Sequence, residues 1–292
     1  MAKMLGSGDR VTFLGLGHMG FHMANAIANA GYSVVGWSRR PKAFEGEPKF
    51  KFEPGLDRAI DGADAIVVCV RDHVAVEDLL FKSRIFEQIA PGGLVIDMGT
   101  SGPQTAIRHG RMFSERSVSY LDAPVSGGTQ GAKDGTLSIF VGGSPDDYAA
   151  AAGLLSAMGR PSYLGRHGSG QIAKLANQII VGVTIAAVAE GLAFAEAGGL
   201  EPLEFLAALD GGFASSRILA LHGPRMAARD YSAAGAVKLH LKDLTLGLQD
   251  SILSDLPHAQ LVKSGFEQLE ASGAGVLDHS AYAALYQGRG AY

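Results

Sequence analysis

Cysteine is nearly absent from this sequence, and its scarcity limits which covalent cross-links the chain can form. The chain of 292 residues has one cysteine, Cys69, within the apolar run AIVVCV. A disulfide within the chain is therefore impossible, which agrees with a reducing compartment. A cysteine in such a run is most often a small buried hydrophobe, and we interpret Cys69 in that way.

The sequence also lacks an excess of positive charge. With 25 Lys and Arg against 29 Asp and Glu, the net charge is −4, which offers no basic footprint for nucleic acid. The first residues, MAKMLGSGDR, lack the apolar core of a signal peptide. No uncharged run reaches the roughly 20 residues of a membrane span. We expect a cytoplasmic protein without nucleic-acid or membrane partners.

Glycine, by contrast, is abundant at 40 residues, and the pattern of the chain changes about halfway. Up to about Leu164, short apolar runs alternate with helical patterns such as GFHMANAIANAG and PQTAIRHGRMFSERS. The strand candidates are RVTFLG, YSVVGWS, AIVVCV, LVIDMG, SYLDAPV and LSIFVGG. Their nearly continuous hydrophobicity is typical of parallel strands covered on both faces. The alternation predicts an α/β domain with a Rossmann-type doubly wound sheet.

Beyond Arg166 only helical patterns follow, which predicts an all-α second domain joined by a long helix. The expected helices cover residues 171–197, 202–209, 215–229, 238–253 and 257–271. A chain of this length is at the size at which one core gives way to two, so we predict domains 1–166 and 167–292. The first of these helices is apolar on more than one side, which indicates a domain spine or a dimer interface.

A glycine motif indicates that the first domain binds a dinucleotide. Gly15, Gly17 and Gly20 have the G-x-G-x-x-G spacing, directly after the strand run VTFL and at the start of a helical pattern. The first glycine allows a tight turn, the second lets backbone approach a pyrophosphate, and the third lets helix and strand pack closely. We therefore predict that the cofactor lies on the whole loop: Gly15, Leu16, Gly17, His18, Met19 and Gly20.

The next strand bears on which dinucleotide is bound. An NAD site generally places an acid about 20 residues beyond the glycines. Here the strand SVVGW is followed by Ser38, Arg39 and Arg40, and the first acid is Glu45. Two guanidinium groups suit a 2′-phosphate, although arginines at a strand end can also be solvated surface. We predict that NADP(H) is preferred, with NAD(H) as the alternative.

Four segments carry a resemblance to a known family. The stretch LDAPVSGGTQGAKDGTLSIFVGG, residues 121–143, resembles the signature of the β-hydroxyacid dehydrogenases, which include 3-hydroxyisobutyrate dehydrogenases and tartronate semialdehyde reductases. GLGHMG, GSGQIAKLANQ and LHLKDL resemble the other family blocks in the same order, so the likeness spans nearly the whole chain. It implies an NAD(P)-dependent oxidoreductase that interconverts a small β-hydroxy acid and its aldehyde or keto acid. It also implies a homodimer or homotetramer.

The resemblance assigns a substrate loop and a catalytic lysine. Ser126, Gly127 and Gly128 match the loop that binds the substrate carboxylate, and exposed N–H groups with a hydroxyl are the donors of an anion nest. Lys174 matches the catalytic lysine, whose ammonium can stabilise a developing alkoxide and deliver a proton. Partial burial should lower its pKa toward the working pH. The alternative is that Lys174 has no catalytic role and lies along an apolar helix with its ammonium in water.

Other site residues follow from the same blocks. Asn177 and Gln178 lie three and four residues after Lys174, on the same helix face, with Gln in place of the second Asn of the family pattern. Lys242 matches a lysine that reaches toward the nicotinamide end of the cofactor, and Thr100 matches a residue near the nicotinamide.

Asp122 also matches the pattern. Because an ionised carboxylate only accepts hydrogen bonds, we assign it a structural role.

The pattern departs from the family in two places. Val70 and Arg71 lie in a loop that borders the cofactor, but Arg71 and Asp72 stand where an apolar residue and proline are usual. Arg217 stands where a small or polar residue is expected; it could bind a second anionic group, form an interface salt bridge, or be solvated.

No histidine has a convincing metal-ligand spacing. His109, His167, His240 and His279 are isolated in the sequence, so we predict no metal site.

Three other classes of protein share part of this pattern. Imine reductases share this architecture but usually carry an acid or tyrosine in place of Lys174. Phosphogluconate-type decarboxylating enzymes are longer and need additional phosphate ligands. A non-catalytic dinucleotide-binding relative would have lost the lysine. The presence of Lys174 therefore favours the reductase.

Overall fold

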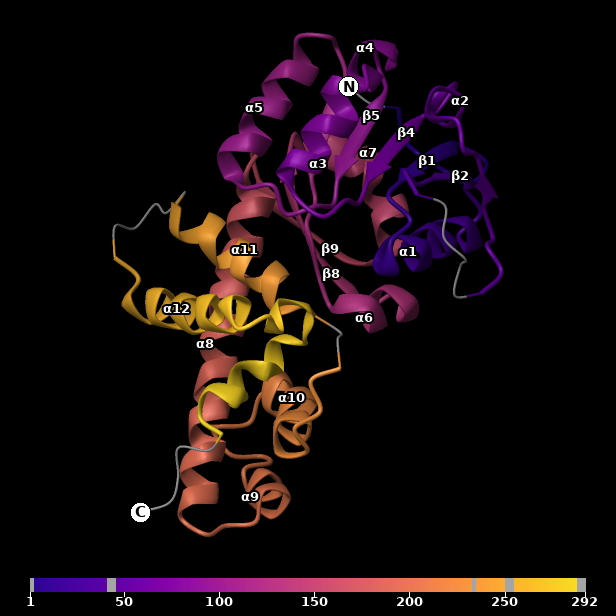
Figure 1. The fold of residues 1–292 in the computed structure, drawn as a ribbon. Coiled ribbons are helices and arrows are strands. Elements are labelled where there is room, and N and C mark those ends of the chain that lie inside the picture. Colours follow the sequence, from indigo (N-terminus) through magenta and orange to yellow (C-terminus); the bar gives the residue numbers. More distant parts are fainter. Residues whose placement is uncertain (1–2, 41–45, 233–234, 250–254, 288–292) are drawn as a thin grey trace. The chain divides into compact units, whose positions relative to one another are not determined.

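The computed structural model describes residues 3–40, 46–232, 235–249 and 255–287 (Figure 1). The chain forms two compact units, residues 1–174 and 175–292. The division falls inside helix α8 (Ser169–Ala197), whereas the sequence places a boundary at residue 166, just before that helix begins. The two units are described separately below.

The first unit is built on a nine-stranded sheet in the order β3-β2-β1-β4-β5-β6-β8-β7, with β9 paired to β8. From β3 to β6 all pairs are parallel. The six predicted strand runs all form strands. The strands are β1 (Arg10–Leu14), β2 (Ser33–Trp37), β3 (Lys51–Phe52), β4 (Ala65–Val68), β5 (Leu94–Asp97), β6 (Ser119–Asp122), β7 (Val125–Ser126), β8 (Leu137–Gly143) and β9 (Gly159–Gly165).

The sheet is not parallel throughout, which corrects the sequence-based expectation for one end of it. β8 runs antiparallel to β6 and to β7, because the chain turns back after β7 through a short helix, α6 (Gly128–Asp134). The sequence also missed β9, which pairs parallel to β8 at an edge of the sheet. Its residues are mostly exposed and include Pro161, so it has no apolar run, and proline is confined to edge strands.

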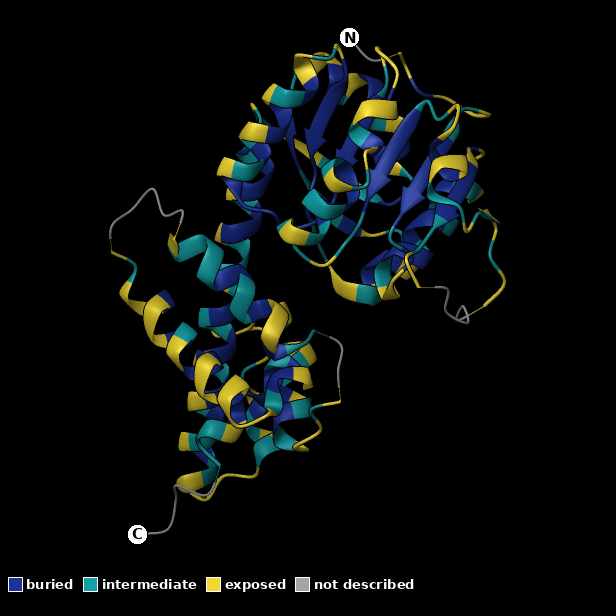
Figure 2. Cartoon of the chain, turned by 45° about the horizontal axis from the view of Figure 1, so that its top comes forward, coloured by how far each residue is buried: buried dark blue, intermediate teal, exposed yellow. Residues whose placement is uncertain are grey.

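Alternate strand residues bury two separate cores, one on each face of the sheet. Phe13, Val67 and Ile96 share a core with α1, α6 and α7, while Leu14, Val68 and Val95 share a core with α2 to α5. Both faces are therefore covered by helices, and the central strands β1, β4, β5 and β6 are buried (dark blue in Figure 2). The further helices are α1 (His18–Asn29), α2 (Leu56–Ile60), α3 (His73–Glu77), the π-helix η1 (Asp78–Lys82), α4 (Ile85–Gln88), α5 (Pro103–Ser114) and α7 (Pro145–Ser156).

Cys69 lies just after β4 and packs against the first of these cores. Burial, with a further contribution from Asp97, raises the pKa of its thiol to about 12. The thiol is therefore neutral at physiological pH, as expected for a small hydrophobe and not for a reactive cysteine.

The second unit is helical, as predicted. After α8 it contains α9 (Pro202–Ala208), α10 (Arg217–Ala227), α11 (Val237–Gln249) and α12 (Pro257–Ala271), and two short 3₁₀ helices, η2 (Ala274–Val276) and η3 (His279–Leu285). Among the described residues, the only β pairing of this unit is an isolated bridge between Ala236 and Asp278. Residues 250–253 of the predicted helix 238–253 lie outside the described residues.

Helix α8 is long and rich in apolar residues. By length and composition alone it could cross a membrane, with a mean hydropathy of 1.8 over an 18-residue window. A core helix of a soluble protein meets the same criterion. Ile185, Ala189 and Leu192 are buried in the core of the helical unit, while 33% of that window as a whole is buried inside the structure.

Candidate active site

The predicted cofactor residues of the first unit gather at one edge of its sheet. Leu14 pairs with Trp37 and with Val68, Val68 with Asp97, and Asp97 with Asp122, so four adjacent strands end level with β1. The loops that leave these ends carry the motif glycines, Ser38 to Arg40, Val70 and Arg71, Thr100, and the segment that continues to Ser126. Ligands of open α/β sheets bind at the carboxyl ends of the parallel strands.

The three motif glycines have the geometry that a dinucleotide requires. Gly15 has φ +111°, and a Cβ there would lie 2.2 Å from the carbonyl oxygen of Cys69. A Cβ at Gly20 would lie 2.0 Å from the carbonyl oxygen of Gly15, so this glycine lets α1 approach β1. Gly17 has no atom within 4 Å of the position of a Cβ.

Gly17 is also the N-cap of α1, and no side chain caps that helix. The backbone N–H groups at the start of the twelve-residue helix are thus open to an anion. The chain therefore fits a dinucleotide pyrophosphate, with His18 and Met19 as the first residues of the helix and Leu16 buried beneath the loop.

The two arginines lie beside this loop. The N–H of Gly15 donates to the carbonyl of Trp37 (2.9 Å), which joins the glycine loop to the end of β2. Ser38 follows directly, and its hydroxyl donates to the carbonyl of Arg40 (3.1 Å). Arg39 and Arg40 are both exposed, so their guanidinium groups can meet a phosphate from solvent.

The unusual pair Arg71 and Asp72 has a local explanation. Asp72 is the N-cap of α3 and accepts from the N–H of Ala75 (2.9 Å), while Arg71 donates to the other oxygen of the same carboxylate (2.8 Å). Asp72 therefore begins a helix, a role for which aspartate is well suited. Val70, between β4 and this turn, is partly buried against the second core.

The predicted substrate loop lies where the chain leaves β7. Ser126 pairs with Ser138 of β8, and the next two residues have positive φ, +134° at Gly127 and +63° at Gly128. Both glycines are exposed. Successive glycines of this kind present backbone N–H groups to solvent, which suits the recognition of a carboxylate.

Lys174 is buried, with 8% of its surface exposed, in the second turn of α8. The start of that helix is tied to the sheet edge by Asp122, whose two oxygens accept from the N–H groups of Gly168 (2.8 Å) and Gln171 (3.0 Å). Burial raises the pKa of Asp122 to about 7, although these hydrogen bonds lower it. Asp122 thus holds the helix that carries the lysine, in agreement with a structural role.

The side chain of Gln171 makes further contacts that the sequence did not predict. Its oxygen accepts from the N–H groups of Ser101 (3.0 Å) and Gly102 (3.2 Å), and its amide nitrogen donates to the carbonyl of Gly99 (2.9 Å). These residues flank Thr100. A glutamine among apolar helical residues gives no sign of these partners, which lie about 70 positions earlier in the chain.

In the second unit, the carboxylate of Asp243 joins two of the predicted site residues. One of its oxygens accepts from the amide nitrogen of Gln178 (2.8 Å), and the other pairs with the ammonium of Lys242 (3.0 Å). The side-chain nitrogen of Asn177 donates to the oxygen of Gln178 (2.9 Å). The structure thus brings Asn177, Gln178 and Lys242 together around Asp243, whose role the LHLKDL block alone did not reveal.

Arg217, for which several roles were open, is the first residue of α10 and is exposed. This position agrees with a solvated arginine and leaves it free of any burial cost.

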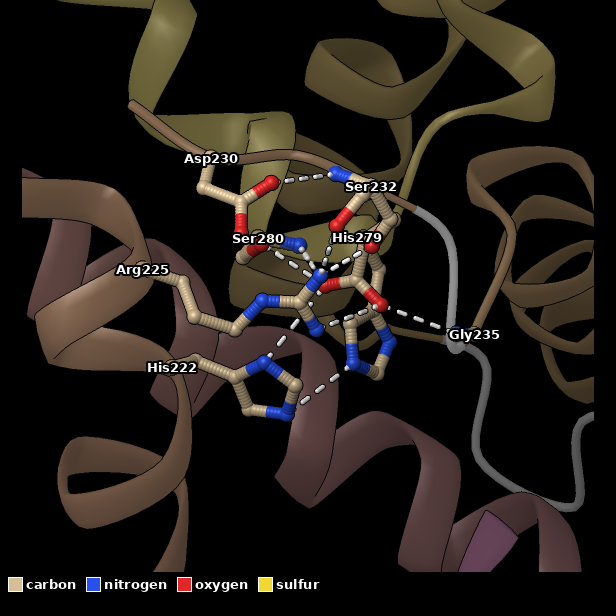
Figure 3. A network of polar contacts seen from close by, with 8 residues as sticks. His222, Arg225, Asp230, Ser232, Gly235, His279 and Ser280 are labelled. Atoms are coloured by element: carbon tan, nitrogen blue, oxygen red, sulfur yellow. Dashed lines mark hydrogen bonds and ion pairs between the residues drawn. The ribbon is translucent and has the colours of Figure 1, made fainter. Parts of the chain in front are cut away.

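His279 is not isolated in space, which corrects the inference from its sequence position. Its Nε2 lies 3.2 Å from Nε2 of His222, and Nδ1 of His222 lies 3.5 Å from the carboxylate of Asp278 (Figure 3). Three such residues could offer ligand atoms to a metal ion. However, Asp278 already accepts from the N–H groups of Gly235 and Ser280 and from the Ser280 hydroxyl, and Arg225 lies 3.4 Å away. Because the guanidinium repels a cation and these bonds satisfy the carboxylate, we assign the cluster a structural role.

Two family models together match most of the chain. Residues 10–181 match the NAD binding domain of 6-phosphogluconate dehydrogenase, and residues 168–286 match the NAD-binding domain of NADP-dependent 3-hydroxyisobutyrate dehydrogenase.

Individual relatives are similar over nearly their full length. The chain is 38% identical to the 2-hydroxy-3-oxopropionate reductase of Escherichia coli (strain K12), covering 93% of this chain and 95% of the relative. It is 33% identical to the 3-hydroxyisobutyrate dehydrogenase of Pseudomonas aeruginosa, and the match covers 96% of this chain and 99% of the relative. The structure is also similar to that of the Mycobacterium tuberculosis 3-hydroxyisobutyrate dehydrogenase, with a TM-score of 0.85 and 25% sequence identity. The match covers 96% of this chain and 99% of that chain. The chain therefore belongs to the β-hydroxyacid dehydrogenase family and is an NAD(P)-dependent oxidoreductase acting on a CH–OH group.

Proposed function

We propose that this enzyme reduces a small aldehyde acid or keto acid with NADPH and that Lys174 donates the proton. The observation that carries the proposal is the burial of Lys174 in a helix whose start is fixed at the carboxyl edge of a dinucleotide-binding sheet. The cofactor supplies a hydride to the carbonyl carbon. The ammonium of Lys174 hydrogen-bonds the carbonyl oxygen, stabilises the charge that develops there, and transfers a proton to it.

The substrate class follows from the loop at Ser126. Exposed N–H groups at Gly127 and Gly128, with the Ser126 hydroxyl, favour a carboxylate group on the substrate. The names of the two relatives given above describe small hydroxy acids or their aldehyde acids. Semialdehydes of short hydroxy acids, and glyoxylate, are therefore the first substrates to examine.

Arg39 and Arg40 support a preference for NADPH over NADH. They follow β2, which is bonded to the glycine loop through Trp37, and no acid stands between them and the motif. Lys242 pairs with Asp243 in the second unit and stays a candidate cofactor residue on the resemblance alone.

We further propose a cytoplasmic homodimer or homotetramer, with residues 1–166 binding the cofactor and residues 167–292 completing the substrate site and the subunit interface. The support is the apolar surface of α8, where Ile180 and Phe194 are 67% and 84% exposed.

The reaction is tested by mixing the purified protein with NADPH, and separately with NADH, and following cofactor oxidation over a panel of small aldehyde and keto acids. Lys174→Ala is assayed in parallel, with Lys263→Ala as a control because Lys263 pairs with Glu267 on α12. Oxidation of NADPH by one panel member, lost only in Lys174→Ala, is the expected result. Cofactor binding with no turnover on any panel member would refute the proposed substrate class.

A further inference from the structure

We infer that Gln171 is a positioning residue, which fixes Lys174 relative to the loop at Thr100. The inference rests on the proposed role of Lys174. It concerns a side chain whose hydrogen bonds lie within the first unit. Gln171 is completely buried, with 0% of its surface exposed.

The amide of Gln171 holds three backbone groups of one loop. Its oxygen accepts from Ser101 and Gly102, and its nitrogen donates to Gly99. These contacts bracket Thr100 on both sides. Because a planar amide that makes three hydrogen bonds cannot rotate without breaking one, the loop and the helix are held in a single arrangement.

The same loop is held from its other side by Asp97. One oxygen of this buried carboxylate accepts from the N–H of Gly99 (2.9 Å), and the other accepts from the Ser101 hydroxyl (3.0 Å). The loop is therefore fixed between a strand end and the first turn of α8, and Gln171 makes the connection to the helix.

The helix start is equally constrained. The backbone N–H of Gln171 donates to Asp122, and a Cβ at Gly170 would lie 2.3 Å from the carbonyl oxygen of Phe140. The glycine thus lets α8 approach the sheet closely enough for Gln171 to reach the loop. Lys174 follows three residues later, on the same side of the helix. Its ammonium is placed by this attachment.

Only glutamine satisfies all three backbone groups. Glutamate could accept from Ser101 and Gly102 but has no donor for Gly99 when ionised, and methionine has a similar length without either function. Catalysis by a positioned proton donor is sensitive to small displacements, so loosening this attachment should lower kcat more than substrate affinity.

The test compares Gln171→Met and Gln171→Glu with the wild type in the NADPH assay. We expect Gln171→Met to lower kcat by about 10- to 100-fold while the KM for the substrate changes by less than about 3-fold. Gln171→Glu, which keeps two of the three bonds, should have an intermediate kcat.

The control is Ser119→Ala. Ser119 is also buried and bonds Asp147 (2.6 Å), but it lies at the opposite end of β6 from Asp122. The Ser119→Ala substitution should lower the melting temperature of the protein without lowering its kcat. Wild-type kcat in both Gln171 variants, or a loss of kcat in Ser119→Ala that matches its loss of stability, would overturn the inference. If the wild type reduces nothing on the panel, or if Lys174→Ala is fully active, it is the proposed function that fails.

Discussion

Two glycines three residues apart have opposite surroundings, and this difference separates folding from cofactor binding. Gly17 has φ −77° and open space at its Cβ position, so alanine fits there in the absence of a ligand. A Cβ at Gly20 would collide with the carbonyl of Gly15. We predict that Gly17→Ala melts within about 2 °C of the wild type but binds NADPH at least about 10-fold more weakly.

Gly20→Ala should instead lose stability, by about 1–3 kcal/mol, because the backbone must shift to make room. Thermal unfolding and titration of NADPH fluorescence measure the two effects. Equal NADPH affinity in Gly17→Ala and the wild type would show that no pyrophosphate approaches this backbone.

The exposed arginines after β2 determine the choice of dinucleotide in our account. Charge-assisted hydrogen bonds contribute about 1.5–3 kcal/mol each, and about 1.4 kcal/mol corresponds to a tenfold change, so Arg39→Ala together with Arg40→Ala should raise the KM for NADPH by at least about 100-fold. The KM for NADH should change by less than about 3-fold, because NADH has no 2′-phosphate. Steady-state assays with both cofactors provide the measurement, and Arg116→Ala, which changes an arginine packed against Phe86, is the control. A similar rise for both cofactors would argue against a 2′-phosphate site.

At the scale of elements, the regular parts of the fold were predictable because they have local signals. The apolar runs of β1, β4 and β5 predicted strands, and the five helices of the second half were expected from their periodicity. β9 was missed because an exposed edge strand with a proline has neither signal. The reversal of β8 was missed because strand direction depends on how the chain turns between Gly127 and Thr136, which hydrophobicity does not encode.

The candidate site shows the same division. Gly15, Lys174 and Ser126 were found because a motif or a family block marks them, and these assignments stay predictions until activity is measured. Gln171 and Asp243 act through partners far away in the sequence, so no local pattern identifies them. His222 and His279 likewise become neighbours only when α10 and η3 pack together.

The cluster around Asp278 makes the helical unit sensitive to acid. Burial alone would raise the pKa of Asp278, but hydrogen bonds from His222, Ser280 and Gly235 outweigh it and hold the pKa well below its ordinary value. The ionised carboxylate therefore stabilises the fold above the unfolded-state pKa of about 4, and this stabilisation is lost as the pH falls further. Asp278→Asn should cost about 3–5 kcal/mol at pH 7 and flatten the loss of stability below pH ~4.

Denaturant unfolding at pH 7 and at two acidic values measures both effects. Asp230→Asn is the matched control, because Asp230 belongs to the same network but is exposed, and it should cost less than about 1 kcal/mol. An Asp278→Asn variant as stable at pH 7 as the wild type would show that the cluster contributes nothing.

At the scale of the whole molecule, the apolar surface of α8 predicts self-association. Ile180 and Phe194 lie fourteen residues apart on this helix and expose most of their surface. Large exposed apolar surfaces commonly mark subunit interfaces. We predict that Ile180→Asp together with Phe194→Asp lowers the mass in solution to that of the 30.3 kDa chain, as measured by light scattering after size exclusion.

Val74→Asp is the control for this experiment, since Val74 is a similarly exposed hydrophobe on α3 of the first unit. It should leave the oligomer intact. A wild-type protein that already elutes as a monomer would contradict the proposed assembly.

The central claim is that the ammonium of Lys174 supplies the proton, and chemical rescue tests it most directly. Lys174→Ala removes the ammonium and leaves space for a small amine in the buried position. We predict that kcat for NADPH-dependent reduction falls by at least about 100-fold and recovers in a saturable manner with methylammonium, but not with tetramethylammonium, which has no N–H. A variant as active as the wild type, or equal stimulation by both ions, would contradict the account.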